Sequence, residues 1–221
     1  MQMNHVKIRE PNKLNFSGAK IRVFIYLMVG VGCVYADGLQ ALDGFLQNQN
    51  TSANFSQTVF GNKKNRTSTG ILEISRPNKF RWEYVEDGQL IVSDSKIIYV
   101  YDKPLQQVTE KKLDASLGKS PALLLAGGSN IKHDYTVTNL NNNESGLEWV
   151  NLVPKKTEDN NGFKLVQIGF NHNTLAQMKF IDSFDNKSTI TFTNVKTGIS
   201  LPASDFTFTP KPGVDVIKAA N

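Results

Sequence analysis

Residues 76–84 read RPNKFRWEY, and from residue 79 onward charged and apolar side chains alternate without a break. The apolar members of this alternation are Phe80, Trp82 and Tyr84, and the charged members are Lys79, Arg81 and Glu83. Successive side chains of a β-strand point to opposite faces of a sheet, so the pattern predicts a strand with one aromatic face. Arg76-Pro77-Asn78 is typical of a turn, and it separates this strand from another predicted at 71–75.

Short strands separated by turn residues continue on both sides of this stretch. Before residue 110, strands are expected at 53–60, 71–75, 79–84, 89–93, 96–101 and 106–109. After residue 130, strands are expected at 134–139, 147–153, 163–170, 175–182, 188–193 and 206–208. Short turns between consecutive strands favour antiparallel pairing. The sequence therefore predicts a mainly β fold with a few helices, built as a barrel or a strongly curved sheet.

Two segments have a helical pattern. Asp37 can cap a helix over 38–48. The apolar stripe of this helix consists of Leu39, Leu42, Phe45 and Leu46. Further along, Ser120 as a cap, Pro121 in the first turn and glycines at 127–128 predict a short, very apolar helix.

The formal net charge of +5 and the pI near 9.2 are unevenly distributed along the 221 residues. Residues 1–36 hold five basic residues and one acidic residue, which is a net charge of +4. The rest of the chain holds 20 basic and 19 acidic residues, so it carries about +1. This near-neutral remainder has no basic surface suited to phosphate, which argues against a nucleic-acid partner.

The first 36 residues have the pattern of a secretory signal. A basic stretch precedes an apolar run at 23–34, and Val34-Tyr35-Ala36 matches a small-x-small cleavage site. The run is broken by glycines and is shorter than a typical membrane span. We expect 1–36 to be a cleaved signal peptide and 37–221 to form one mature domain.

Cys33, the only cysteine, offers an alternative because it follows a glycine, as a lipid-attached cysteine would. Acylation at Cys33 would anchor the protein, and a single N-terminal membrane anchor is a third possibility. If cleavage occurs after Ala36, the mature chain has no cysteine and depends on its apolar core alone for stability.

No catalytic motif stands in a suitable context. Two S-x-x-K matches begin at Ser93 and Ser116, in a predicted turn and a loop rather than at the start of a helix. Gly-Lys-Ser at 118–120 lacks the earlier glycine of a phosphate-binding loop. We expect a protein that is not an enzyme, although acid–base catalysis by paired carboxylates that are distant in the sequence stays open.

A metal site is not expected either. Beyond residue 36 the only histidines are His133 and His172, and no cysteine accompanies them. Asp134 is adjacent to His133, but in the strand predicted here the two side chains would point to opposite faces.

The stretch at 76–84 also resembles the R-P-x-x-F-R-W-x-Y signature of the periplasmic outer-membrane lipoprotein carriers, the LolA family. Further motifs match in the same order along the chain. They are F-S-Q at 55–57, V-S-D-S-K at 92–96 followed by Tyr99 and Tyr101-Asp102, L-Q-Q-V-T at 105–109, S-P-A-L-L-L at 120–125 and F-T-F-T-P-K-P-G-V-D-V at 206–216. Six motifs in register over nearly all of 37–221 identify the chain as a member of this family.

Two positions depart from the family's pattern. Ser95 stands where a turn glycine is usual, so the turn is expected to tolerate a side chain or to carry backbone strain. Tyr99 replaces a tryptophan, and it adds a hydroxyl to a wall that the resemblance implies is apolar.

The resemblance implies an open, incomplete antiparallel β-barrel that is covered by a helical lid, with an apolar cavity between them. It implies transport in the periplasm without a cofactor. The implied partners are triacylated lipoproteins, an inner-membrane ABC-type complex that releases them, and an outer-membrane acceptor. We expect a monomer.

The resemblance also assigns roles to individual residues. Arg76 is the expected latch, whose guanidinium hydrogen-bonds to the lid backbone and holds the empty cavity closed. The expected lipid-cavity residues are Phe80, Trp82, Tyr84, Leu90, Tyr99, Tyr101 and Trp149. The expected lid residues are Leu42, Phe45, Leu46, Ala122 and Leu125.

Two rival functions fit the same fold. The first is an outer-membrane lipoprotein acceptor anchored at Cys33, and the second is a periplasmic binder of other lipids. The chemical state of the mature N-terminus distinguishes the first from a carrier, and the bound ligand distinguishes the second.

Overall fold

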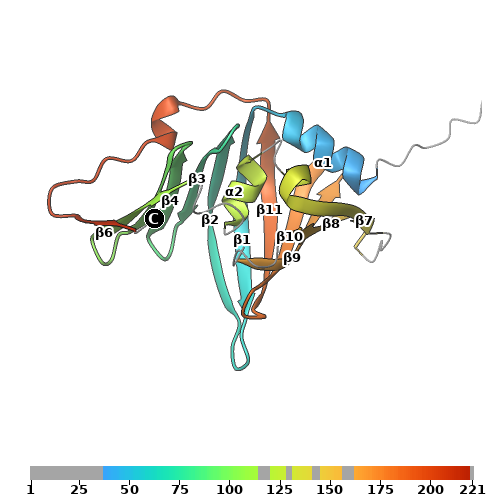
Figure 1. Ribbon diagram of the computed structural model, residues 1–221, viewed down its shortest axis with the longest axis horizontal. Helices are drawn as coiled ribbons and strands as arrows, with labels where there is room; N and C mark the ends of the chain where they lie inside the picture. The colour runs from blue at the N-terminus through green and yellow to red at the C-terminus, as the bar shows by residue number, and fades with distance from the viewer. Residues whose placement is uncertain (1–36, 114–119, 128–130, 141–144, 156–161, 220–221) are drawn as a thin grey trace, which may run out of the picture. The chain divides into compact units, whose positions relative to one another are not determined.

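The computed structural model describes residues 37–113, 120–127, 131–140, 145–155 and 162–219. The expected signal peptide at 1–36, Cys33 and the S-x-x-K match at Ser116 lie outside these residues. Twelve strands form one sheet in the order β12-β6-β5-β4-β3-β2-β1-β11-β10-β9-β8-β7 (Figure 1). The sheet is open, with β12 at one edge and β7 at the other.

Eleven of the twelve predicted strands are present, and most of them extend further than expected. The first six are β1 (Asn50–Phe60), β2 (Arg66–Ser75), β3 (Lys79–Tyr84), β4 (Gln89–Asp94), β5 (Ile97–Asp102) and β6 (Gln107–Lys112). The others are β7 (Tyr135–Leu140), β8 (Glu148–Pro154), β9 (Phe163–Asn171), β10 (Thr174–Asp182), β11 (Lys187–Thr197) and β12 (Asp215–Lys218). All neighbouring pairs are antiparallel except β12 with β6, which is parallel.

Two tight turns show how polar side chains close these hairpins. Ser95, in the β4–β5 turn, has a left-handed φ of 84°. The Asp94 carboxylate accepts hydrogen bonds of 2.8 Å from the backbone N–H groups of Lys96 and Ile97, which holds the chain in this turn. The expectation that the turn accepts a side chain at Ser95 is confirmed, at the cost of a strained φ.

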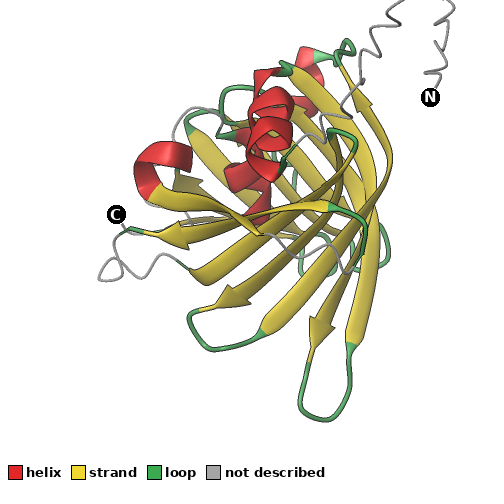
Figure 2. Ribbon diagram, turned by 90° about the vertical axis from the view of Figure 1, so that its right-hand side faces the viewer, coloured by secondary structure: helices red, strands yellow, loops and turns green. Residues whose placement is uncertain are grey.

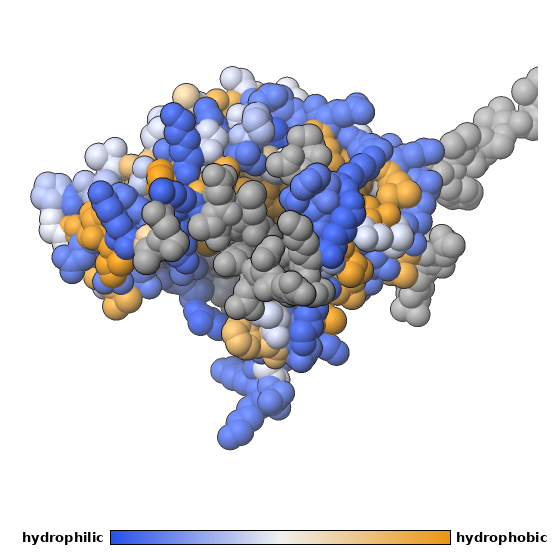
Figure 3. All heavy atoms as spheres, in the orientation of Figure 1, coloured by the Kyte–Doolittle hydropathy of each residue, from blue (hydrophilic) through white to orange (hydrophobic). Residues whose placement is uncertain are grey.

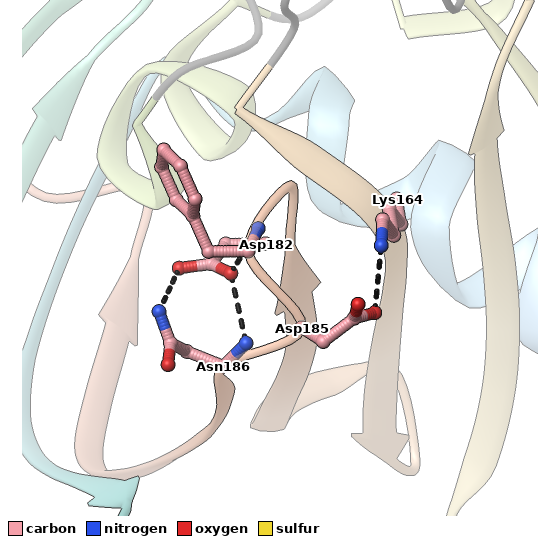
Figure 4. A network of polar contacts seen from close by, with 5 residues as sticks. Lys164, Asp182, Asp185 and Asn186 are labelled. Atoms are coloured by element: carbon pink, nitrogen blue, oxygen red, sulfur yellow. Dashed lines mark hydrogen bonds and ion pairs between the residues drawn. The ribbon is translucent and has the colours of Figure 1, made fainter.

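The β10–β11 turn is closed by the Asp182 carboxylate (Figure 4). Burial alone would raise the Asp182 pKa, but hydrogen bonds from Asn186 and from the Phe184 backbone N–H lower it below its ordinary value. Lys164 on β9 forms an ion pair of 2.7 Å with Asp185 in the same turn. These contacts join the ends of three neighbouring strands.

Three α-helices lie on one side of the strongly curved sheet (Figure 2). α1 (Gly38–Gln47) packs against β7, β8, β9 and β10, and α2 (Pro121–Ala126) packs against β2 and β3. α3 (Ile131–Asp134) leads directly into β7. We call the sheet face beneath α1 and α2 the inner face, and the opposite face the outer face.

The N-terminal caps of α1 and α2 involve the residues that the sequence predicts, but only the cap of α1 makes a side-chain hydrogen bond. The Asp37 carboxylate accepts a hydrogen bond of 2.8 Å from the Gln40 N–H, so the predicted cap of α1 is confirmed. Ser120 is the N-cap residue of α2, as expected, but its side chain makes no capping hydrogen bond. Pro121 at the first position lacks an N–H group, so this turn has one fewer donor to satisfy.

The segment around His133 and Asp134 is helical, where a strand was expected to begin. Consequently the two side chains do not point to opposite faces. His133 Nδ1 lies 2.7 Å from Asp134 Oδ1 at an exposed position.

The strand expected at 206–208 is also wrong. Residues Ala203–Phe206 form the 3₁₀-helix η3, and the strand that follows is β12, which begins only at Asp215. Prolines at 202, 210 and 212 cannot donate a backbone hydrogen bond, which opposes a ladder in this stretch. The segment instead lies over the outer face, where Phe208 contacts the rings of Tyr99 and Tyr101.

Candidate functional site

Arg76 lies between β2 and β3 and joins both major helices to the sheet. Its Nη1 donates a hydrogen bond of 2.6 Å to the carbonyl oxygen of Asn48, the residue that caps the C-terminus of α1. Its Nη2 donates one of 2.9 Å to the carbonyl oxygen of Leu125 in the last turn of α2. The last carbonyls of a helix lack partners within the helix, so a cation placed there satisfies them and complements the helix dipole.

The contacts around Arg76 hold its guanidinium in a fixed position. The guanidinium carbon lies 4.4 Å from the ring centre of Phe45 in α1, a cation–π arrangement. The backbone N–H of Arg76 donates to the Gln49 carbonyl (2.8 Å), and the Gln49 side chain donates back to the Arg76 carbonyl. Two residues on, the Asn78 N–H donates to the carbonyl of Ala126 at the end of α2 (3.0 Å).

Arg76 is a buried charge without an ion-pair partner among the described residues. Only 6% of the residue is exposed. Burial lowers the pKa of Arg76 to about 10, so the guanidinium remains protonated at neutral pH. Its Nε–H has no acceptor within the described part of the chain. Among the described residues, the positive charge is therefore held by carbonyl dipoles and an aromatic ring.

The aromatic residues of β3 lie on the inner face, as their alternation predicts. Phe80 and Trp82 are 0% and 2% exposed, and Tyr84 packs against the same core cluster. The Tyr84 hydroxyl donates to Gln57 Oε1 at 2.7 Å, at the end of the strands away from Arg76. These three residues are thus brought together beneath the helices.

All five expected lid residues contact this inner-face cluster. Leu42, Phe45, Ala122 and Leu125 are fully or almost fully buried in it, and Leu46 packs against it partly buried. The helices lie directly on the aromatic residues, and the apolar surface between lid and sheet is closed in this state.

Leu90, Tyr99 and Tyr101 do not belong to this site, contrary to the resemblance-based expectation. Directly opposed residues of neighbouring strands share a face, and Leu90 is opposed to Glu83 and to Tyr101. Glu83 lies between Trp82 and Tyr84, so it points to the outer face, and Leu90 and Tyr101 follow it there. Tyr99 lies two residues before Tyr101 on the same face.

These three residues instead belong to a second, smaller apolar layer on the outer face. Ring centres of Tyr99 and Tyr101 lie 5.7 and 5.2 Å from that of Phe208. Val92 and Val108, on the same face of β4 and β6, are 0% exposed. The segment containing η3 covers this part of the sheet, so β4 and β5 are apolar on both faces.

Trp149 is also on the outer face rather than in the expected lipid cavity. Its neighbours Val150 and Leu152 face the core cluster, and the Trp149 ring lies across Gly169, which is opposed to it on β9. A β-carbon at Gly169 would stand 3.0 Å from the ring. Lys179 Nζ lies 4.6 Å from the ring centre.

Two further aromatic residues complete the inner-face site. The ring centre of Phe55 on β1 lies 4.5 Å from that of Trp82, and the ring centre of Phe192 on β11 lies 6.4 Å from it. The alternation within the predicted strands at 53–60 and 188–193 could have located both residues. The Asn48 carbonyl had no signal in the sequence, because every residue has a carbonyl.

A polar pocket lies at the end of the strands away from Arg76. It has a volume of about 520 Å³, and its lining includes Gln57, Arg66, Ser68, Tyr84 and Asp87. Arg66 and Ser68 each lie 2.7 Å from the Asp87 carboxylate. The inner face therefore ends in a charged, hydrogen-bonded rim.

Among the described residues, the three most exposed large apolar side chains lie in turns. Phe184 is 84% exposed, Leu105 68% and Val85 62%, and each belongs to a turn between neighbouring strands. In the face that Figure 3 shows, apolar residues form separate groups among hydrophilic ones. The aromatic surface of the inner face is thus kept from water.

Within the described residues, no helix has the length and apolar character needed to cross a bilayer. The same residues include no group of three or more His, Cys, Asp and Glu side chains that could hold a metal ion.

Tyr135 gives a pH dependence that can be tested. Burial, together with the nearby Asp134 charge, raises the pKa of Tyr135 to about 12. In the unfolded chain a tyrosine ionises near pH 10, so the unfolded state loses this proton first as the pH rises. We expect the free energy of unfolding to fall between about pH 10 and about pH 12. Urea unfolding across this range should show a smaller fall for Tyr135→Phe, and an equal fall would contradict the assignment.

Comparison with known proteins identifies the family of this chain. A family model described as "Outer membrane lipoprotein carrier protein LolA" matches residues 47–209. The chain belongs to the LolA family. An outer-membrane lipoprotein carrier protein of Chromobacterium violaceum is 42% identical over 188 residues, covering 82% of this chain and 88% of that protein. One from Nitrosospira multiformis is 36% identical over 203 residues, covering 90% and 97%.

A solved structure supports the fold of this LolA family member. An uncharacterized conserved protein of Thermus thermophilus aligns with a TM-score of 0.51 and 10% identity, covering 82% of this chain and 98% of that one. The family match includes Arg76 and all of the inner-face aromatic residues named above. The predicted open, mainly β fold with a few helices is confirmed.

Proposed function

We propose that the protein is a periplasmic carrier that binds the acyl chains of lipoproteins between its inner face and its helices. The observation that carries this proposal is the contact of one buried guanidinium with carbonyls of both α1 and α2, above a closed aromatic surface. Relatives at 36–42% identity are named outer-membrane lipoprotein carrier proteins. The protein would act as a carrier and not as a catalyst.

The physical task explains why such a surface must open and close. Each CH₂ group of an acyl chain costs about 0.8 kcal/mol when it is exposed to water. A carrier must offer an equivalent apolar surface to the chains and must cover that surface when it is empty. Here α1 and α2 supply the cover, and displacing them would expose the core residues Phe80, Trp82 and Phe55 to a ligand.

Arg76 has the properties of a latch for this cover. Its fork of donors reaches two separate carbonyls at once, which a lysine ammonium could not reproduce. Hydrogen bonds from a charged donor contribute about 1.5–3 kcal/mol each, so the closed state is favoured but a ligand with several apolar chains can displace it. Leu42, Phe45, Leu46, Ala122 and Leu125 would be the lid side chains that exchange sheet contacts for acyl chains.

The route of the cargo follows from this role. The carrier would receive triacylated lipoproteins from an ABC-type complex in the inner membrane and would pass them to an acceptor in the outer membrane. Energy for loading would come from the inner-membrane complex, since the sequence has no complete phosphate-binding loop of its own. Residues 1–36 would direct export and be removed, leaving 37–221 as a monomeric carrier.

Mass spectrometry of the tagged protein, purified from the periplasm without detergent, tests this proposal. We expect a chain that begins near Asp37 and carries triacylated lipoproteins. An unrelated tagged periplasmic protein, purified in parallel, controls for non-specific capture. A chain that begins at acylated Cys33 would indicate an outer-membrane acceptor, and bound phospholipid without lipoprotein would indicate a binder of other lipids. Either result would overturn the carrier role.

A further inference from the structure

The interior of the protein contains polar atoms without hydrogen-bond partners. Among the described residues, four that are at least nine-tenths buried have an unpartnered side-chain atom. These atoms are Thr51 Oγ1, Arg76 Nε, Trp82 Nε1 and Tyr135 Oη. The exposed fractions of the four residues are 0%, 6%, 2% and 4%. Buried polar groups are nearly always paired in folded proteins, so each of these needs an explanation.

The four atoms share one chemical property, which is that each can donate a hydrogen bond. The Nε–H and the indole N–H are donors only, and the two hydroxyls can donate or accept. The unpartnered atoms that can only accept, on Asn50 and Glu148, belong to residues that are less buried. Each of the four deeply buried atoms can therefore act as a spare donor, and none of them is an acceptor only.

The register places Thr51 within the aromatic site. Thr51 on β1 is opposed to Ile74 on β2, and Ile74 is opposed to Phe80 on β3. All three share the inner face in one row across the sheet, at the end where Arg76 contacts the helices. Tyr135 lies at the start of β7, the edge strand on the other side of β1 from β2 and β3. It belongs to the same core cluster.

Trp82 contributes least of the four to this argument. Its N–H lies near the Tyr84 hydroxyl. Burial raises the pKa of Tyr84, and the Trp82 N–H acts to lower it, although the two groups do not meet hydrogen-bond geometry. Thr51, Arg76 and Tyr135 have no such neighbour among the described residues. The case for an unused donor therefore depends on these three residues.

We propose that Thr51, Tyr135 and the Arg76 Nε–H group bind carbonyl oxygens of the ligand, so that the site selects acyl esters and amides over plain hydrocarbon chains. This inference rests on the proposed function, because it names the ligand chemistry of the same interior. Each ester or amide that attaches an acyl chain brings a carbonyl oxygen that accepts hydrogen bonds. An ester has no donor of its own. A desolvated donor is unfavourable in the empty protein, and a ligand carbonyl would relieve that cost.

Two isosteric substitutions test the proposal. Thr51→Val and Tyr135→Phe each remove a hydroxyl without a large change in volume. Because the hydroxyl has no partner in the closed protein, we expect each variant to be as stable as the wild type or more stable in urea. A purely structural role would instead lower the stability.

Ser93→Ala is the matched control. Ser93, on β4, is also fully buried and carries a hydroxyl group. It lies in the same inner-face row, opposed to Phe80 on β3. Its Oγ donates a hydrogen bond of 2.7 Å to the Asn78 carbonyl. We expect Ser93→Ala to lose stability because that carbonyl is left without its partner, and to bind ligand as the wild type does.

The ligands are two synthetic lipopeptides with the same three long acyl chains on an N-terminal cysteine. One has two ester-linked chains, and in the other these esters are replaced by ethers, which removes the two carbonyls. With the full mature chain, we expect the ester ligand to bind more tightly, by about threefold to tenfold for each hydrogen bond. Thr51→Val and Tyr135→Phe should weaken binding of the ester ligand by this factor and leave binding of the ether ligand unchanged.

The outcomes separate this inference from the function on which it rests. Equal affinity of the wild type for both ligands, with no effect of either substitution, would overturn the carbonyl site and leave the carrier role intact. Failure of the wild type to bind either lipopeptide would overturn the carrier role itself. An equal loss of affinity for both ligands would show that the hydroxyls act only through the shape of the cavity, and would also overturn the inference.

Discussion

Replacing Arg76 with leucine is expected to leave uptake of lipoprotein intact and to block its transfer to the acceptor. In the closed protein the guanidinium is bonded to the carbonyls of Asn48 and Leu125. Leucine cannot make these bonds, so the substitution disfavours the closed, empty state and leaves the loaded state less affected. Loss of even one of these bonds, about 1.5–3 kcal/mol, would shift the balance toward the loaded carrier by about tenfold to more than a hundredfold.

The measurement is transfer of a labelled lipoprotein from the loaded carrier to the purified acceptor, with uptake measured separately. Arg81→Leu is the control, because Arg81 lies on the outer face of β3 and pairs with Glu83 at 2.6 Å. It removes the same charge from the neighbouring strand without touching the helices, and should transfer normally. Efficient transfer by Arg76→Leu would rule out the latch role.

Arg76→Lys separates the charge from the geometry. Lysine keeps the positive charge, but its single ammonium cannot reproduce a planar fork that reaches two carbonyls. We expect transfer by this variant to be closer to that of Arg76→Leu than to that of the wild type. Recovery of full transfer with lysine would show that charge alone closes the protein.

Gly70→Ala is expected to produce the largest loss of stability, about 3 kcal/mol or more. Gly70 on β2 lies on the inner face, opposed to Phe55 on one side and Tyr84 on the other. A β-carbon there would overlap the Glu83 carbonyl and the Phe55 ring. The carbonyl belongs to the sheet backbone, so neither group can move aside without disturbing the ladder or the aromatic cluster.

Urea unfolding checks this expectation, with Gly44→Ala as the control. Gly44 lies in α1, and a β-carbon added there meets nothing within 4 Å. Alanine is the better helix former, so Gly44→Ala should raise the free energy of unfolding by about 0.5–1 kcal/mol. A similar change in both variants would mean that the close approach at Gly70 does not limit the packing.

The sequence was a good guide to elements and a poorer guide to faces. Alternation along 79–84 correctly placed Phe80 and Trp82 on one face of the strand, and that face is buried beneath the helices. In β5, residues 97–101 are all apolar or aromatic, so alternation cannot tell which side faces the helices. The answer depends on the register between strands and on the distant 203–208 segment, which makes the outer face apolar too.

Trp149 illustrates a related difficulty. A large buried aromatic residue suggests the core. Trp149, however, is buried on the outer face, against Gly169 on β9 and Lys179 on β10. Its burial depends on the pairing of Trp149 with Gly169, which only the assembled sheet defines. Arg76 was singled out because a short motif marks it, whereas the two carbonyl groups that it contacts depend on where the helices end.

The helices rest on different parts of one sheet, α1 on β7–β10 and α2 on β2 and β3. Their separate positions do not require them to move together, but the Arg76 guanidinium is hydrogen-bonded to the end of each. When that side chain leaves its position, both restraints end in the same event. The cover should therefore open cooperatively, as a single two-state switch, rather than as two flaps that loosen one after the other.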